Sequence, residues 1–131
     1  MYQIFHRVEI WKEARELCKR IFEITSIEPF RSDFKFRDQI RTSSGSIMDN
    51  IAEGFERDGN KEFIQFLSVS KGSCGETRSQ SYRAIDYQYI NQDILDELII
   101  RTTQLSKKIS SFITYLKRSE FKGSKYHISE L

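Results

Sequence analysis

Residues 40–55 read IRTSSGSIMDNIAEGF, a stretch in which isoleucines recur at helical spacing across a run of small residues. Its centre, residues 42–46, has low intrinsic helix propensity, so a loop that splits the segment is one interpretation. The apolar phase nevertheless continues from Ile40 through Ile47 to Ile51. This continuity favours one helix packed closely against a neighbouring helix.

Three further segments have the same helical periodicity. They cover about residues 8–25, 60–89 and 91–117, and the single proline, Pro29, separates the first from residues 40–55. Four amphipathic helices, the last three joined by short turns, predict an all-α, antiparallel up-down four-helix bundle. We expect residues 1–118 to form the bundle domain and residues 119–131 to form a polar C-terminal tail.

Polar and small residues mark the predicted helix ends. Ser32 or Asp33 can cap the second helix, Asn60 the third and Asn91 the fourth. Gly54, followed by the turn at residues 58–59, is a plausible end for the second helix. Three other glycines fall inside predicted helices and are interpreted as points of close helix contact: Gly45, Gly72 and Gly75.

The composition agrees with one helical domain. The chain has 131 residues, six glycines and one proline, which is too little turn chemistry for a sandwich or barrel. The apolar runs are too short to span a membrane. Cys18 and Cys74 lack chelating spacing and are interpreted as buried free thiols. With no secretory signal pattern at the N-terminus, we expect a cytoplasmic protein.

The charge is balanced overall but unevenly distributed. Lys and Arg number 21 and Asp and Glu 19, a net charge of +2. Residues 101–131 carry seven basic and two acidic residues, which leaves residues 1–100 at −3. A basic end could attract phosphates, although a solvated helix face followed by a tail gives the same pattern.

The residues needed for common bundle chemistry are missing from the sequence. Neither His6 nor His127 has a Glu three residues before it, as a di-iron centre would need. The histidines and cysteines lack the spacing of zinc ligands, and the sequence has no convincing nucleophile–base pair. The segment 54–61 lacks the ending of a phosphate-binding loop. We therefore expect no catalytic activity, no metal and no cofactor.

Polar residues lie on or beside the apolar stripes of the second and third helices. We hypothesise that Glu76 is partly buried and hydrogen-bonded to Ser43, Ser46 or Asn50. The alternatives are ordinary surface charges, an interface between subunits, or a ligand or nucleic-acid site. The polar residues in question are Asn50, Glu53, Arg57, Glu76 and Arg78.

Four stretches, 38–41, 46–57, 61–67 and 72–76, strongly resemble a known family. With the Asn-Ile-Ala-Glu-Gly core at residues 50–54, they are similar to the bacterial four-helix-bundle proteins named after the intervening sequences of 23S ribosomal RNA genes, also called S23 proteins. The resemblance implies a ring-like homopentamer. It also implies similarity to the accessory protein of diversity-generating retroelements, a pentamer that binds nucleic acid and the reverse transcriptase. The structural or interface motif would comprise Asn50, Glu53, Gly54, Arg57, Gly72 and Glu76.

Two functions follow as hypotheses. The first is a homo-oligomeric bundle that binds RNA or another nucleic acid through basic residues. The second is a protein-interaction scaffold without nucleic-acid binding, using the aromatic residues Tyr82, Tyr87, Tyr89, Tyr115 and Tyr126. The candidate nucleic-acid contacts are Arg37, Arg41, Arg101, Lys107, Lys108, Lys117 and Arg118.

Overall fold

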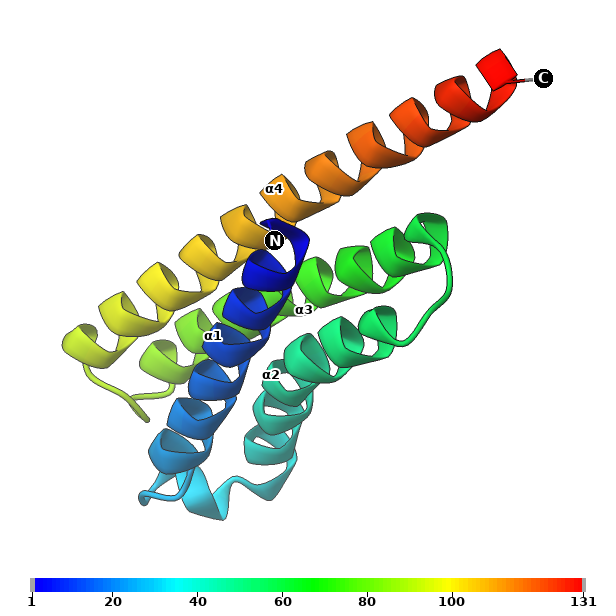
Figure 1. Ribbon diagram of the computed structural model, residues 1–131. Coiled ribbons are helices and arrows are strands. Elements are labelled where there is room, and N and C mark those ends of the chain that lie inside the picture. Colours follow the sequence, from blue (N-terminus) through cyan, green and yellow to red (C-terminus); the bar gives the residue numbers. More distant parts are fainter. Residues whose placement is uncertain (1, 131) are drawn as a thin grey trace.

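The computed structural model describes the backbone of residues 2–130 and the side chains of residues 6–119. Within that backbone there are four α-helices, one short 3-10 helix and no strand. The elements are α1 (Tyr2–Thr25), η1 (Phe30–Ser32), α2 (Phe34–Phe55), α3 (Asn60–Asp86) and α4 (Gln92–Glu130). Each α-helix packs against the next, and α1 also contacts α4 (Figure 1). The predicted all-α, antiparallel up-down four-helix bundle is therefore confirmed.

The predicted continuity of α2 through its small centre is also correct. Asp33 is its N-cap, with the side chain accepting a hydrogen bond of 3.2 Å from the Phe36 backbone N–H. Asn91 caps α4 in the same way, through the backbone N–H of Ile94 at 2.9 Å. Both caps were predictable because an acceptor precedes an apolar periodic run.

The prediction that Asn60 caps the third helix was wrong. α3 does begin at Asn60, but the N-cap is Gly59, which has extended backbone and no side chain to offer. The Asn60 amide instead donates to the backbone oxygen of Leu116 on α4, at 3.4 Å. The local pattern assigned this side chain to the helix cap, but it bonds to a residue of another helix instead.

α1 and α4 are both longer than predicted. α1 begins at Tyr2 and not near residue 8, and α4 continues past residue 117 to Glu130. Figure 1 shows the C-terminal part of α4 extending beyond the other helices. Each further residue of an established helix adds one backbone hydrogen bond. The loss of apolar periodicity therefore removes the face that would pack on the bundle, but it does not end the helix. The division into a bundle domain of residues 1–118 and a tail of residues 119–131 stays a prediction.

The core is a continuous apolar cluster contributed by all four helices and by η1. It includes Ile21, Ile47, Leu67 and Phe112, each with at most 1% of its surface exposed. Polar residues on α2 and α3 interrupt it, and their side chains are as deeply buried as the aliphatic ones. Within the described part of the chain, no helix combines the length and apolar character needed to cross a membrane.

Candidate functional site

A buried hydroxyl network joins the centres of α2 and α3. The Ser43 hydroxyl donates to Gln80 Oε1 at 2.5 Å and lies 2.9 Å from Thr77 Oγ1. One turn along, the Ser70 hydroxyl donates to the backbone oxygen of Ile47 at 2.7 Å. Serine and threonine are small enough to pack into a helix contact, and their hydroxyl groups here satisfy one another's hydrogen-bonding capacity. This polar centre therefore stabilises the α2–α3 contact and is not open to a ligand.

The hypothesis for Glu76 was wrong. Its side chain is exposed, and it accepts a hydrogen bond of 3.4 Å from the Gln80 amide rather than one from Ser43, Ser46 or Asn50. A buried network does exist at that level, but the uncharged Thr77 and Gln80 occupy it. Burying a carboxylate without a cation costs far more free energy than burying a hydroxyl or an amide. This cost explains why Thr77 and Gln80 occupy the buried network and Glu76 does not.

The interpretation of three glycines inside the helices as points of close helix contact was also wrong. A Cβ added at Gly45, Gly72 or Gly75 would meet nothing within 4 Å. The glycine that permits a close approach is Gly54, where a Cβ would lie 2.7 Å from Phe63 Cδ1. Gly54 therefore lets the end of α2 pack directly on the α3 aromatic ring.

The other members of the predicted interface motif are local. The Asn50 amide donates to the backbone oxygen and hydroxyl of Ser46 at 2.8 and 2.9 Å. Arg57, two residues after the end of α2, forms an ion pair of 2.7 Å with Glu53 in the last turn of that helix, and both side chains are about half exposed. None of these contacts tests an interface with another subunit, which stays a prediction.

Two of the predicted nucleic-acid contacts, Arg37 and Arg41, are held by their own chain. Arg41 donates to the Thr25 hydroxyl at 2.8 Å and lies over the Phe22 ring, 4.4 Å from its centroid. Arg37 donates to Asp38 Oδ1 at 3.0 Å and covers the Phe34 ring. Arg41 therefore ties α2 to α1, and Arg37 ties α2 to η1 through a further hydrogen bond of 3.2 Å to the backbone oxygen of Arg31.

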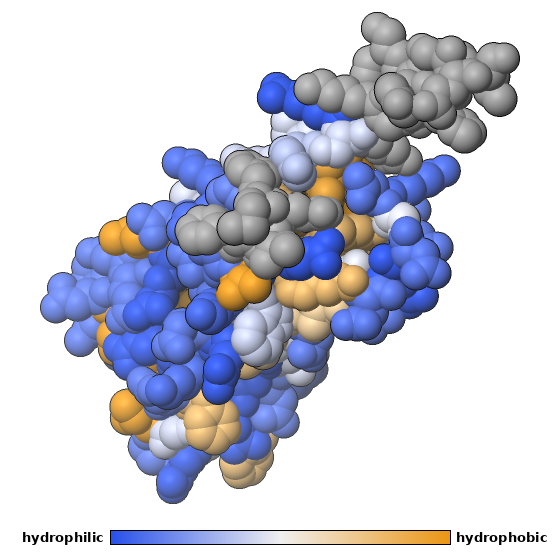
Figure 2. Space-filling view, in the orientation of Figure 1, coloured by the Kyte–Doolittle hydropathy of each residue, from blue (hydrophilic) through white to orange (hydrophobic). Residues whose placement is uncertain are grey.

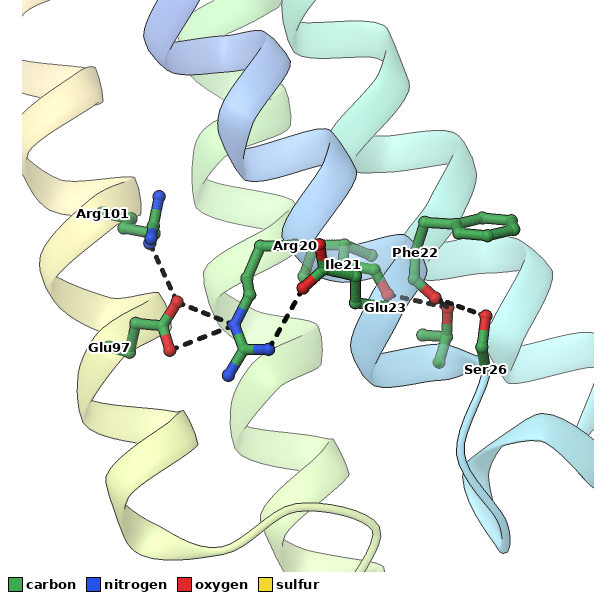
Figure 3. Close-up of polar contacts among 8 residues, drawn as sticks. Arg20, Ile21, Phe22, Glu23, Ser26, Glu97 and Arg101 are labelled. Atoms are coloured by element: carbon green, nitrogen blue, oxygen red, sulfur yellow. Dashed lines mark hydrogen bonds and ion pairs between the residues drawn. The ribbon is translucent and has the colours of Figure 1, made fainter.

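Arg101 and Lys108 are paired with acidic residues. Glu97 accepts from Arg101 at 2.9 Å and, through both oxygens, from Arg20 on α1 at 2.9 and 3.1 Å (Figure 3). The hydrogen bond from Arg20 lowers the pKa of Glu97.

Lys108 lies farther along the same contact between α1 and α4. It donates to Glu13 at 2.7 Å and to Glu9 at 2.9 Å. The hydrogen bond to Glu13 raises the pKa of Lys108. The cations on this side of α4 are therefore neutralised by acids on α4 itself and on α1.

Three predicted residues remain available. Lys107, Lys117 and Arg118 are exposed and make no hydrogen bond or ion pair with the side chains that the structure describes. Lys107 and Arg118, eleven residues apart, lie on nearly the same face of α4, whereas Lys117 lies about 100° away from Arg118 around the helix, so the three do not form one row. The seven predicted residues are consequently not brought together as one surface.

A groove between α3 and α4 brings together a different set of cations. Its volume is about 630 Å³, and its basic lining residues are Lys71, Arg78 and Lys117. Arg78 is fixed by two hydrogen bonds to Thr102, of 3.1 and 3.2 Å. The remaining lining is uncharged: Ser68, Gly72, Gly75, Ser106, Ser110, Ile113 and Thr114.

Among residues 6–119, whose side chains are described, no acidic side chain lines this groove, which distinguishes it from the α1–α4 side. Of these three cations, only Lys117 is among the nucleic-acid contacts predicted from the sequence. Lys71 and Arg78 are seven residues apart, two turns along one face of α3, and that spacing is the signal that could have found them. The antiparallel pairing of α3 with α4 then adds Lys117.

The aromatic residues proposed for a protein scaffold divide into two groups. Tyr82 and Tyr87 are about half exposed. Tyr89 is partly buried and donates to Asp33 at 2.8 Å, while Tyr115 stacks on Phe112. Tyr126 lies outside the residues whose side chains are described. The face in Figure 2 is mostly hydrophilic, with hydrophobic residues in small, separated areas.

Both cysteines are free, and burial raises the pKa of Cys74 to about 12, so its reactive thiolate form is rare at neutral pH. Cys18 is half-buried, and burial raises its pKa as well. Among the residues searched, no three His, Cys, Asp or Glu side chains are grouped to hold a metal ion. The absence of catalysis and of cofactors stays a prediction.

Comparisons with a family model and with solved structures both give matches. A family model described as 23S rRNA-intervening sequence protein matches residues 6–111. The fold is similar to the crystal structure of a protein with unknown function from the S23 ribosomal protein family of Bacteroides thetaiotaomicron VPI-5482. That comparison has a TM-score of 0.77 and 22% sequence identity, and it covers 83% of this chain and 98% of the other. No curated protein matches the chain.

Proposed function

Because the chain belongs to the 23S rRNA-intervening sequence protein family, we propose that it is a non-enzymatic bundle protein that binds RNA through the groove between α3 and α4. The observation that carries this proposal is that Lys71, Arg78 and Lys117 line one groove and that no acidic side chain among the described residues lines it with them. Cations without a neighbouring acid keep their attraction for phosphate. The serine and threonine hydroxyls between them can donate to phosphate oxygens.

The shape of the groove supports contact with a nucleic-acid backbone rather than with one base. Gly72 and Gly75 leave space above the surface of α3, since a Cβ at either position would meet nothing within 4 Å. Backbone contacts of this kind position a nucleic acid without reading its sequence. We therefore expect binding to depend strongly on salt and only weakly on base sequence.

The test is binding of a mixed RNA pool at about 50 and 200 mM salt. The double variant Lys71→Ala, Lys117→Ala should bind at least about tenfold more weakly at low salt, with a shallower dependence of affinity on salt. The matched control is Arg15→Ala, Lys19→Ala, which removes the same charge from exposed positions on α1. Equal losses in both variants would contradict a role for this groove.

The same measurement separates the alternative function. If the unaltered protein retains no RNA even at about 50 mM salt, the nucleic-acid proposal fails and the protein-interaction scaffold takes its place. Tyr82 and Tyr87, each about half exposed, are then the first residues to vary.

We also propose that the protein is a homo-oligomer, and specifically a pentamer. The family resemblance suggests this assembly, and repeating the groove around a ring would multiply the phosphates that one particle neutralises. Light scattering should give five times the chain mass of 15.6 kDa. A particle of the single-chain mass would refute the assembly.

A further inference from the structure

A second groove lies on the opposite flank of α3, between α2 and α3. It consists of two adjoining cavities with volumes of about 650 and 230 Å³. Lys35, Gln39 and Arg83 line both cavities and therefore mark the place where the two meet. Two of these three residues are cations.

Arg83 is held in place by stacking and not by hydrogen bonds. Its guanidinium carbon lies 4.3 Å from the centroid of the Phe36 ring and 5.7 Å from that of Tyr87. Phe36 is itself buried and packed against Phe30, with ring centroids 5.1 Å apart. The stacked guanidinium is thus positioned by a rigid base, which reduces the entropy lost when it binds.

The N–H groups of Arg83 are unused within the described structure. No hydrogen bond or ion pair joins Arg83 or Lys35 to another described side chain, although all the charged residues near them are described. An arginine stacked on its face keeps its edge free for a bidentate interaction with an oxyanion. Lys35 lies in the first turn of α2, where the helix dipole also favours an anion.

Three acidic residues, Asp33, Asp38 and Glu76, line the two cavities, and none of them forms an ion pair with Arg83 or Lys35. Asp33 accepts from the Phe36 backbone N–H through Oδ1 and from the Tyr89 hydroxyl through Oδ2. Asp38 pairs with Arg37 at 3.0 Å, and Glu76, which lines the larger cavity only, accepts from Gln80. Asp86, one turn after Arg83, forms no ion pair with it within 4.0 Å. The nitrogen donors of Arg83 and Lys35 therefore have no carboxylate partner within 4.0 Å among the described residues and are free to bind a ligand.

We propose that Arg83, Lys35 and Gln39 form a binding site for a phosphate group. Arg83 supplies a planar pair of N–H donors, Lys35 a positive charge and Gln39 an amide donor, which together match several oxygens of one phosphate. This site is separate from the α3–α4 groove and does not depend on the RNA proposal. Its phosphate could belong to a nucleic-acid backbone or to a small molecule, and the two sources share the same chemistry.

The test is an NMR titration that follows the side-chain Nε–H signals of the arginines at constant ionic strength. One arm uses inorganic phosphate and the other a short RNA oligonucleotide. We expect the Arg83 signal to shift and saturate in at least one arm, while the signal of Arg15 does not. Arg15 is the matched reference because it also lies over an aromatic ring, Trp11, and is exposed outside both grooves.

Substitution completes the test. Arg83→Gln should weaken binding at least about fivefold, and Arg83→Lys should recover only part of it, because lysine keeps the charge but not the planar pair of donors. Arg15→Gln should leave binding unchanged. Circular dichroism checks that each variant is folded.

Each outcome has a definite meaning. A shift with both probes supports a site that accepts backbone phosphate, and a shift with inorganic phosphate alone supports a site for a small phosphorylated molecule. RNA that binds without moving the Arg83 signal leaves the α3–α4 proposal standing and overturns this one, provided inorganic phosphate also leaves the signal unmoved. Equal losses in Arg83→Gln and Arg15→Gln would likewise overturn it.

Discussion

The α2–α3 and α1–α4 contacts hold the same bundle together by different means. Between α2 and α3, a glycine admits an aromatic ring and buried hydroxyl groups bond to one another. Between α1 and α4, the contact is the least extensive of the four neighbouring helix pairs, and ion pairs at partly exposed positions span it. Shape and buried hydrogen bonds are insensitive to salt, whereas exposed ion pairs are weakened by it. We therefore expect α1 to separate from α4 more readily than α2 from α3.

The largest expected effect breaks the α2–α3 contact at Gly54. In Gly54→Ala the new Cβ would lie 2.7 Å from Phe63 Cδ1, and the Phe63 ring is buried against Phe55 and Phe112 and cannot move freely. The strain outweighs the gain in helix propensity, so we expect a net loss of about 1–2 kcal/mol in the free energy of unfolding, measured by urea denaturation.

The matched control is Gly75→Ala, on the open flank of α3. A Cβ there meets nothing within 4 Å, so alanine should raise the free energy of unfolding by about 0.5–1 kcal/mol. Destabilisation of similar size at both glycines would show that close packing is not special to the α2–α3 contact.

An intermediate effect is expected from Thr77→Val, which keeps the shape of the side chain and removes its hydroxyl. Thr77 is fully buried, and its Oγ1 lies 2.9 Å from Ser43 Oγ and bonds to the backbone oxygen of Ser73. We expect a loss of about 1 kcal/mol that is the same at low and high salt. Thr114→Val removes an exposed hydroxyl from α4 and should cost almost nothing. A salt-dependent loss in Thr77→Val would contradict the comparison.

The smallest effect is expected at the α1–α4 contact. Glu97→Gln removes the acid that joins Arg20 to Arg101, and because these side chains are partly exposed we expect a loss of about 0.5 kcal/mol that shrinks in high salt. The control Glu76→Gln has no ion pair to lose.

The pH dependence of that contact has a definite sign. Because the folded-state pKa of Glu97 is lowered, its contribution is complete above the usual glutamate pKa of about 4.3 and disappears as the pH falls through the lowered value. The stabilities of the unaltered protein and Glu97→Gln should therefore converge in acid. A constant difference down to strongly acidic pH would mean that the Glu97 charge is not what stabilises the contact.

Much of the fold follows from local patterns, whereas the candidate site depends on which helices meet. Apolar periodicity predicts the four helices, and acceptors at Asp33 and Asn91 predict two helix starts. The same logic failed at Asn60, because a tertiary contact with Leu116 outweighs capping.

The charges show the same limit more sharply. Arg101 and Lys108 look like free cations in the sequence, but Glu97 and the α1 acids neutralise them in the bundle. Lys71, by contrast, lies outside the basic clusters of the sequence, yet in the structure it lines the same groove as Lys117 of α4. A site built across two helices is visible only once their pairing and rotation are known.

The length of α4 has a consequence for how the protein moves through a solvent. At 1.5 Å per residue its 39 residues span about 58 Å, against about 33 Å for the 22 residues of α2. A particle with such a projection has more friction than a sphere of equal mass and leaves a gel-filtration column early. Elution volume would therefore overstate the number of chains, so the assembly is to be counted from scattered light or sedimentation equilibrium, neither of which depends on shape.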